Sequence, residues 1–111
     1  MSAPSVLQTH LFDSSGRWIA WYRPGLPYVW SVRNRWIGWF PWPDDPEVLD
    51  PSGEYLGAVV GDRLLTRTSR LPRPVPARVP EPRRPVGPPD VAGTTSVPPP
   101  PGYADVPRSR L

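Results

Sequence analysis

Hydrophobic and polar residues alternate in short runs through the first two thirds of the chain, with a period of two residues that is typical of β-strands. No window carries the spacing of a long helix. Turn residues separate the runs, so the pattern predicts seven short strands, at residues 11–13, 17–22, 28–31, 35–40, 47–50, 54–60 and 63–67. We therefore expect an all-β fold.

Three segments share a similar sequence motif: residues 11–22, 29–40 and 48–59. They begin 18 and 19 residues apart, and each reads as a strand, a tight turn and a second strand. Asp or Ser opens each turn, where its side chain accepts hydrogen bonds from the backbone. Each turn then has the residue that a positive φ requires in a three-residue hairpin loop with a bulge, namely Gly16, Asn34 and Gly53.

The second strands of the three repeats also carry similar residue types at equivalent positions. Alternation places one aliphatic residue of each repeat on a common face, namely Ile19, Ile37 and Leu56, and one aromatic residue on the other, namely Trp18, Trp36 and Tyr55. The next position in each repeat holds a small residue, namely Ala20, Gly38 or Gly57. We expect the repeats to meet there around a pseudo-symmetry axis, the alternative being that a neighbouring ring lies over the glycine.

A weaker fourth unit follows, made from Ala58–Val60, a Gly61–Asp62 turn and residues 63–67. The fold class that we predict is a small meander of three to four β-hairpin repeats around this axis. An extended proline-rich tail follows it.

The repeats resemble the four-fold beta flower family of small bacterial β-hairpin-repeat proteins. The resemblance lies in Phe12-Asp13-x-x-Gly16 to Ala20, in Trp36-Ile37-Gly38-Trp39-Phe40, and in Leu49-Asp50-x-x-Gly53 to Gly57. It covers residues 11–67 and implies short hairpins around a central pseudo-four-fold axis. It implies no enzymatic role.

Composition divides the 111 residues. All six Trp lie between Trp18 and Trp42, whereas 13 of the 20 Pro follow Leu71. Such dense proline disfavours helix and sheet and favours an extended polyproline II chain. We therefore divide the chain into an N-terminal segment (1–10), a β-hairpin-repeat domain (11–70) and a proline-rich extended or disordered tail (71–111).

Charge follows the same division. Residues 11–70 hold seven Arg and seven acids, so the net charge of +3 comes from the tail. Six Arg spread over that tail are too sparse for a phosphate-binding patch, so we do not expect a nucleic-acid partner. We also expect no signal peptide, no transmembrane segment and, with no Cys, no disulfide.

The sequence offers little for catalysis, and we expect no enzyme. His10 is the only histidine and has no evident nucleophile partner. The acidic connector, which holds Asp44, Asp45, Glu47 and Asp50, lacks a calcium-loop pattern, and we expect a solvated loop beside Arg residues. We predict no catalytic residue, no metal and no cofactor.

Aromatic and proline residues are the candidates for contact with a ligand or partner. The ligand or partner platform would comprise Trp21, Tyr22, Trp39 and Trp42, of which Trp42, between two prolines, has no equivalent in the repeat. The tail offers as anchors Arg83, Arg84, Pro100, Pro101 and Tyr103. The last three lie in a Pro-Pro-x-Tyr phrase that resembles a WW-domain ligand.

We expect a non-enzymatic interaction or structural protein whose proline-rich arm docks on, or tethers to, a larger bacterial or phage-like assembly. The partner would be a protein bound through residues 71–111, and self-association stays open. The location would be the cytoplasm or an assembly such as a virion. The alternative is a small module that binds carbohydrate or peptide on its Trp and Tyr rings.

Overall fold

The computed structural model describes residues 8–77, 80–83, 87–88 and 91–111. In this part of the chain there are eight strands and one short 3-10 helix. They are β1 (Thr9–Phe12), β2 (Trp18–Tyr22), β3 (Tyr28–Ser31), β4 (Trp36–Trp39), β5 (Glu47–Leu49), β6 (Tyr55–Val60), β7 (Arg63–Arg67), β8 (Tyr103–Asp105) and η1 (Arg108–Arg110). All seven predicted strands are confirmed, and β8 and η1 are additions.

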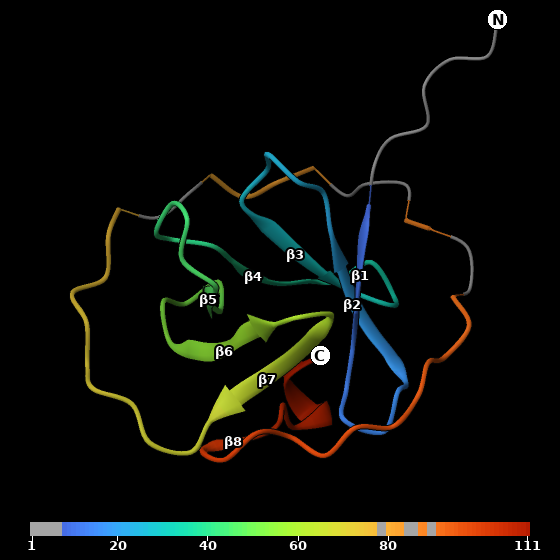
Figure 1. Cartoon of the computed structure of the whole chain (residues 1–111). Coiled ribbons are helices and arrows are strands. Elements are labelled where there is room, and N and C mark those ends of the chain that lie inside the picture. Colours follow the sequence, from blue (N-terminus) through green and yellow to red (C-terminus); the bar gives the residue numbers. More distant parts are fainter. Residues whose placement is uncertain (1–7, 78–79, 84–86, 89–90) are drawn as a thin grey trace, which may run out of the picture.

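The sheet is closed. Strands β1 to β8 pair in sequence order, each antiparallel to the next. A parallel contact between Phe12 of β1 and Arg63 of β7 joins the ends, and the Phe12 N–H donates to the Asp62 carbonyl at 2.8 Å. Strands β1 to β7 therefore form a barrel, and β8 adds to it along β7 (Figure 1).

The three repeat turns share one geometry, as predicted. Their φ angles are 87° at Gly16, 59° at Asn34 and 95° at Gly53. The N–H of each donates to the residue that opens its turn, at 3.1, 2.9 and 2.9 Å respectively. In each hairpin the register shifts by a bulge before the turn, at residues 11/12, 29/30 and 48/49. These are three-residue loops closed by a bulge, which explains the Gly or Asn in this column.

The core has four similar parts. Each pair of strands contributes one buried aliphatic residue from its first strand and one from, or next to, its second. The pairs are Leu11 with Ile19, Val29 with Ile37, Val48 with Leu56, and Leu64 with Val106. Val106 directly follows β8, so the fourth unit consists of β7 and β8.

The fourth unit thus differs from the prediction. The hairpin from β6 to β7 does exist, with Gly61 at φ 63°, but it connects the third unit to the fourth. The strand that pairs with β7 in the fourth unit is β8, residues 103–105. In this pair Leu65 lies opposite Asp105, and Arg67 lies opposite Tyr103. Residues 68–102 occupy the position of the short turns in the other units, and we call them the proline-rich loop.

The glycine column marks close contact between units, as expected. A Cβ on Gly38 would lie 2.7 Å from the Leu49 carbonyl oxygen, and one on Gly57 would lie 2.5 Å from that of Leu65. These backbone contacts leave no room for a side chain at either glycine. The indole N–H of Trp36 donates to the Gly38 carbonyl at 2.8 Å, but Trp18 makes the same bond to Ala20, so this bond does not explain the glycine.

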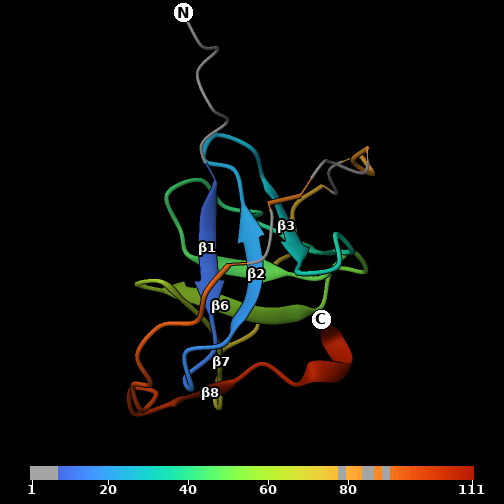
Figure 2. The same ribbon diagram turned by 90° about the vertical axis from the view of Figure 1, so that its right-hand side faces the viewer.

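The proline-rich loop passes over the turns of the other three units. Val75 lies next to Gly53, and Gly87 lies next to the side chain of Asn34. Thr94 lies next to Gly16, and its N–H donates to the Gly16 carbonyl at 2.8 Å. Figure 1 shows the described parts of the loop around the outside of the barrel, and Figure 2 shows β8 and η1 together at one end. The segment expected to be an extended or disordered tail therefore contains a strand and a core residue. The division of the chain into segments 1–10, 11–70 and 71–111 stays a prediction.

Candidate functional site

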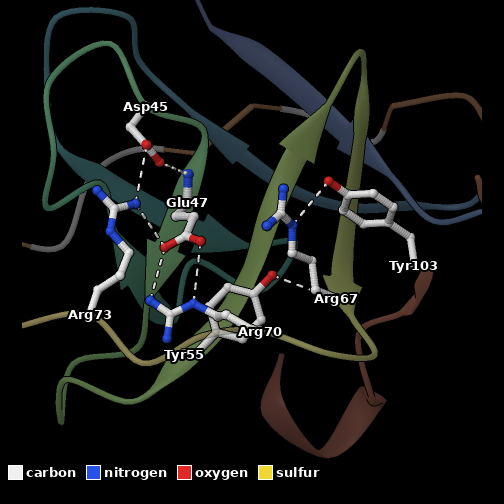
Figure 3. A network of polar contacts seen from close by, with 7 residues as sticks. All are labelled: Asp45, Glu47, Tyr55, Arg67, Arg70, Arg73 and Tyr103. Carbon is white, nitrogen blue, oxygen red and sulfur yellow. Dashed lines mark hydrogen bonds and ion pairs between the residues drawn. The ribbon is translucent and has the colours of Figure 1, made fainter. Parts of the chain in front are cut away.

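Two arginines at the start of the proline-rich loop bind two carboxylates of the barrel (Figure 3). Arg70 makes two hydrogen bonds to Glu47, Nη2 to Oε2 at 2.9 Å and Nε to Oε1 at 3.3 Å. Arg73 Nη1 lies 3.2 Å from both Glu47 Oε2 and Asp45 Oδ2. We call these four residues the arginine clasp. A bidentate pair at a buried carboxylate is among the stronger and more directional polar contacts.

The clasp favours the ionised form of both of its carboxylates. The hydrogen bond from Arg70 lowers the pKa of Glu47 below 4.5 against the opposing effect of burial. The pKa of Asp45 is also lowered, chiefly by the Glu47 backbone N–H and then by Arg73. The acidic residues thus lie beside arginines, as the sequence predicted, and those arginines come from the proline-rich loop. The expectation of a solvated loop is wrong for Glu47, which is buried in β5.

Aromatic rings support the same arginines. The Arg73 guanidinium lies 3.6 Å from the centroid of the Trp42 ring, and that of Arg70 lies 4.5 Å from Tyr55. A planar guanidinium can stack on a ring while its edge binds a carboxylate, which an ammonium group cannot do. The clasp therefore fixes the start of the loop through charge and stacking together.

The end of the loop is fixed by Tyr103. Its hydroxyl accepts from Arg67 Nε at 3.2 Å, and this hydrogen bond raises the pKa of Arg67. The Tyr103 N–H donates to Pro100 at 3.1 Å, and Gly102 has φ 85°, so Pro100–Tyr103 forms a type II turn with Pro101 at its second position. This turn leads into β8, and its conformation is not the polyproline II helix that WW domains bind.

Three of the four predicted platform residues lie together. Tyr22, Trp39 and Trp42 line a hollow of about 860 Å³. We call it the aromatic hollow; its other lining residues include Leu26, Phe40, Pro41, Pro46 and Ala77. Trp39 is buried, so Tyr22 and Trp42, both half-buried, offer more accessible ring surface. The hollow adjoins the clasp, because Asp45, Pro46 and Val59 also line a hollow of about 740 Å³ beside Arg70 and Arg73.

Trp21 lies elsewhere. Its side chain is fully buried, stacks on Trp30 with the ring centroids 6.1 Å apart, and donates from Nε1 to Asn34 Oδ1 at 3.3 Å. It holds the second turn in place from inside the fold. The repeat pointed to this difference, because Trp21 occupies a repeat position whereas Trp42 has no equivalent in the repeat.

The predicted tail anchors are also separated. Arg83 is exposed and lines a hollow of about 360 Å³ with Tyr28 and Trp30. Pro100, Pro101 and Tyr103 form the turn before β8, and Arg84 lies outside the described residues. Tyr103 therefore binds its own barrel.

Sequence reasoning missed two contacts that join the C-terminal residues to the barrel. The Ser14 N–H and hydroxyl donate to the Asp105 carboxylate at 2.7 and 2.6 Å. Arg110 binds Asp50 at 3.0 Å and the Tyr55 carbonyl at 2.7 Å. The partners lie 91, 60 and 55 residues apart, so no local signal could have found them.

The sequence profile of the 4-fold beta flower proteins matches residues 5–105, which is most of the chain and includes β8. The chain belongs to this family. No curated protein and no solved structure matches it. The family accounts for the fold and is consistent with the four-part core.

In this beta flower protein, the described residues contain no group of three or more His, Cys, Asp or Glu side chains that could hold a metal. His10 contacts the edge of the Trp18 ring at a centroid distance of 6.0 Å. No helix in the described ranges has the length and apolar character needed to cross a membrane. The ion pairs and hydrogen bonds of Arg70, Arg73, Arg63 and Tyr103 connect the proline-rich loop and β8 to the barrel.

Proposed function

We propose that this beta flower protein is a non-enzymatic protein-interaction module whose barrel presents the proline-rich loop to a partner protein. One observation carries the proposal: the loop is held at both ends while three of its described aliphatic side chains, Leu71, Val75 and Val97, are exposed. Leu71 is 86% exposed and Val75 is 53% exposed, although the neighbouring Arg70 and Arg73 are bound to the barrel. Exposed apolar residues on a fixed segment are typical of a binding surface.

Fixing the loop favours binding. A free proline-rich chain already loses little conformational entropy on docking, because proline restricts its backbone. Here the clasp, the Tyr28 hydroxyl bond to the Pro80 carbonyl at 2.9 Å, and the Arg63 bond to Thr95 at 2.6 Å restrict it further. Such preorganisation increases affinity because less ordering remains to be done in the complex.

The partner would be a protein of a larger assembly that covers the outer edge of the loop. The aromatic hollow extends this surface, since Leu26 and Trp42 line it and Leu26 is itself exposed. The contact would thus combine loop prolines, exposed aliphatic side chains and aromatic rings, a composition common at the centre of protein interfaces.

The loop can be tested without removing β8. Deleting residues 71–111 would also remove Val106 and damage the core, so loss of binding by that variant would not be informative. We instead replace residues 68–102 with a copy of residues 13–17, the turn that joins the equivalent positions Phe12 and Trp18 in the first hairpin. We expect this variant to fold, with the wild-type far-UV circular dichroism of the barrel, and to lose co-purification with the partner from the source cells.

A finer variant tests the exposed aliphatic residues. Leu71→Ser with Val75→Ser should weaken capture of the same partner and leave stability unchanged, because these side chains make few contacts. Pro24→Ser is the control, since Pro24 is also exposed but lies outside the loop and lines none of the main hollows among the described residues. A partner retained equally by the loop replacement and by the wild type would exclude the loop as the binding surface.

The aromatic hollow supports a second candidate function, the binding of a small carbohydrate or peptide. Tyr22, Phe40 and Trp42 line it, and rings of this kind stack on sugars and prolines. Titration of glycans and proline-rich peptides against Trp fluorescence tests it, with Trp42→Phe as the comparison. A spectral change that Trp42→Phe abolishes supports the hollow; no change with any ligand excludes it.

A further inference from the structure

The fold gathers arginines that are far apart in the sequence at the end that holds η1. Arg108 and Arg110 belong to η1, Arg17 follows the first turn, and Arg33 and Arg35 lie in the second. Three of them, Arg17, Arg33 and Arg108, line a hollow of about 280 Å³, which we call the basic hollow. Counting the charges along the sequence could not reveal this hollow. Residues 11–70 have no net charge, and the hollow combines two of their arginines with one from residues 71–111.

The charges of this hollow are largely uncompensated. Arg110 pairs with Asp50, and Arg35 donates to the Leu111 carbonyl at 3.3 Å. Arg33 and Arg108, by contrast, form no ion pair with an Asp or Glu side chain in the described ranges, and no Asp or Glu side chain lines the hollow. Arg17 lies near Asp13, whose pKa is below its ordinary value. Burial raises this pKa, but the hydrogen bonds from Ser15 and Arg17 and the charge of Arg17 together lower it by more. The Arg17 backbone N–H donates to Asp13 Oδ1 at 2.9 Å, so this carboxylate offsets part of the Arg17 charge.

The floor of the hollow is apolar. It is formed by Trp18, Ile19, Val32 and Leu111. The Trp18 indole N–H is already bound to the Ala20 carbonyl at 2.8 Å, so the half-buried ring offers only apolar surface. The hollow is smaller than the 300–1,000 Å³ usual for small-molecule sites. It is suited to one apolar side chain.

We infer that the basic hollow binds an acidic peptide segment of a protein, in which carboxylates flank one apolar side chain. The guanidinium groups would pair with the carboxylates, and the floor would take the apolar group. The structure favours this occupant over nucleic acid, because three arginines make a short cationic patch and the floor is mainly aliphatic, whereas single strands need a long groove and stacking rings. The basic hollow shares no lining residue with the clasp or the aromatic hollow, so the inference stands apart from the proposed function.

Selection from a displayed library of random twelve-residue peptides tests this inference. We expect enrichment of peptides with Asp or Glu on both sides of a Leu, Ile or Phe. In fluorescence anisotropy with one selected peptide, Arg33→Glu and Arg108→Glu should each weaken binding by about tenfold or more, as expected for reversal of an interfacial charge. Arg83→Glu changes the net charge equally at an exposed site outside the hollow, and should have an effect of about twofold or less.

Two controls distinguish the alternatives. Far-UV circular dichroism and Trp fluorescence must match the wild type for each variant, which we expect because Arg33 and Arg108 are exposed. A labelled twelve-nucleotide single-stranded DNA serves as the competing anion. Absence of acidic residues from the selected peptides, equal loss with Arg83→Glu, or tighter binding of the DNA than of any selected peptide would each overturn the inference.

Discussion

Val106→Ala provides a direct test of the four-part core. Val106 is 5% exposed and packs with the aliphatic residues of the other three units. The structure places it among them although it lies at the end of a proline-rich stretch. If residues 103–111 were an appended tail, this substitution would have no effect on the stability of the barrel.

The expected cost follows from burial. Replacing Val with Ala removes two methyl groups, each worth about 0.8 kcal/mol when buried, or roughly 1.6 kcal/mol together. The surrounding side chains close the space only in part, and the remaining cavity adds to the loss. We therefore expect the free energy of unfolding to fall by about 2 kcal/mol.

Urea unfolding, followed by Trp fluorescence, measures this change. Val97→Ala is the matched control, because Val97 lies in the proline-rich loop and is 49% exposed; its effect should be under about 0.5 kcal/mol. Leu64→Ala sets the scale for a fully buried residue, at about 2–5 kcal/mol. If Val106→Ala matched Val97→Ala while Leu64→Ala showed its full cost, the assignment of Val106 to the core would be refuted.

Three further predictions concern the turns and the clasp. Gly38→Ala should lower stability by about 1–3 kcal/mol in urea unfolding, because its Cβ would lie 2.6 Å from a Val48 methyl group; a neutral result would contradict the close contact of units. Asn34→Gly keeps the positive φ but leaves the buried Trp21 N–H without its acceptor, at a cost of about 1–2 kcal/mol in the same assay; no loss would show that this bond is dispensable. Because the pKa of Glu47 is lower in the folded than in the unfolded chain, its contribution is complete above pH 4.5 and is lost as pH falls through its folded pKa. Glu47→Gln should flatten that part of the stability profile, and an equal slope in both proteins would exclude the clasp as its source.

The strands and turns could be predicted because their causes are local. In each turn, the Asp or Ser that accepts the backbone hydrogen bonds and the Gly or Asn that takes a positive φ lie within four consecutive residues. The alternation of apolar and polar residues then shows which face of each strand is buried. The same reasoning found that Ile19, Ile37 and Leu56 share a face. Neighbouring residues alone are enough to specify these features.

The fourth unit could not be predicted, because its cause is distant. β8 has only three residues and follows a Pro-Gly turn, so it gives no periodic signal. Val106 is a single aliphatic residue between Asp105 and Pro107. Only pairing with β7, across 35 intervening residues between Arg67 and Tyr103, makes it part of the core.

The site residues show the same limit. Trp21 and Trp42 are alike in type, but Trp21 stacks on Trp30 inside the fold whereas Trp42 lies half-buried under Arg73. Arginines counted as part of a sparse tail meet barrel arginines at η1. Burial and charge density depend on the closed sheet, which a one-dimensional pattern does not contain.

The proline-rich loop is an enlarged hairpin turn, and this explains its arginines. The other units close with the five residues between their paired strand ends, whereas β7 and β8 are closed by residues 68–102, which are 35 residues. For a flexible chain that difference costs about 2 kcal/mol of closure entropy. The clasp, the Arg63–Thr95 bond and the Tyr103 contacts oppose this cost by fixing the loop to the barrel at several points. Since five residues close each of the other three units, the family's hairpin geometry does not require a loop of this length. A long loop with exposed aliphatic residues that is fixed by a clasp is what the proposed partner-binding role predicts.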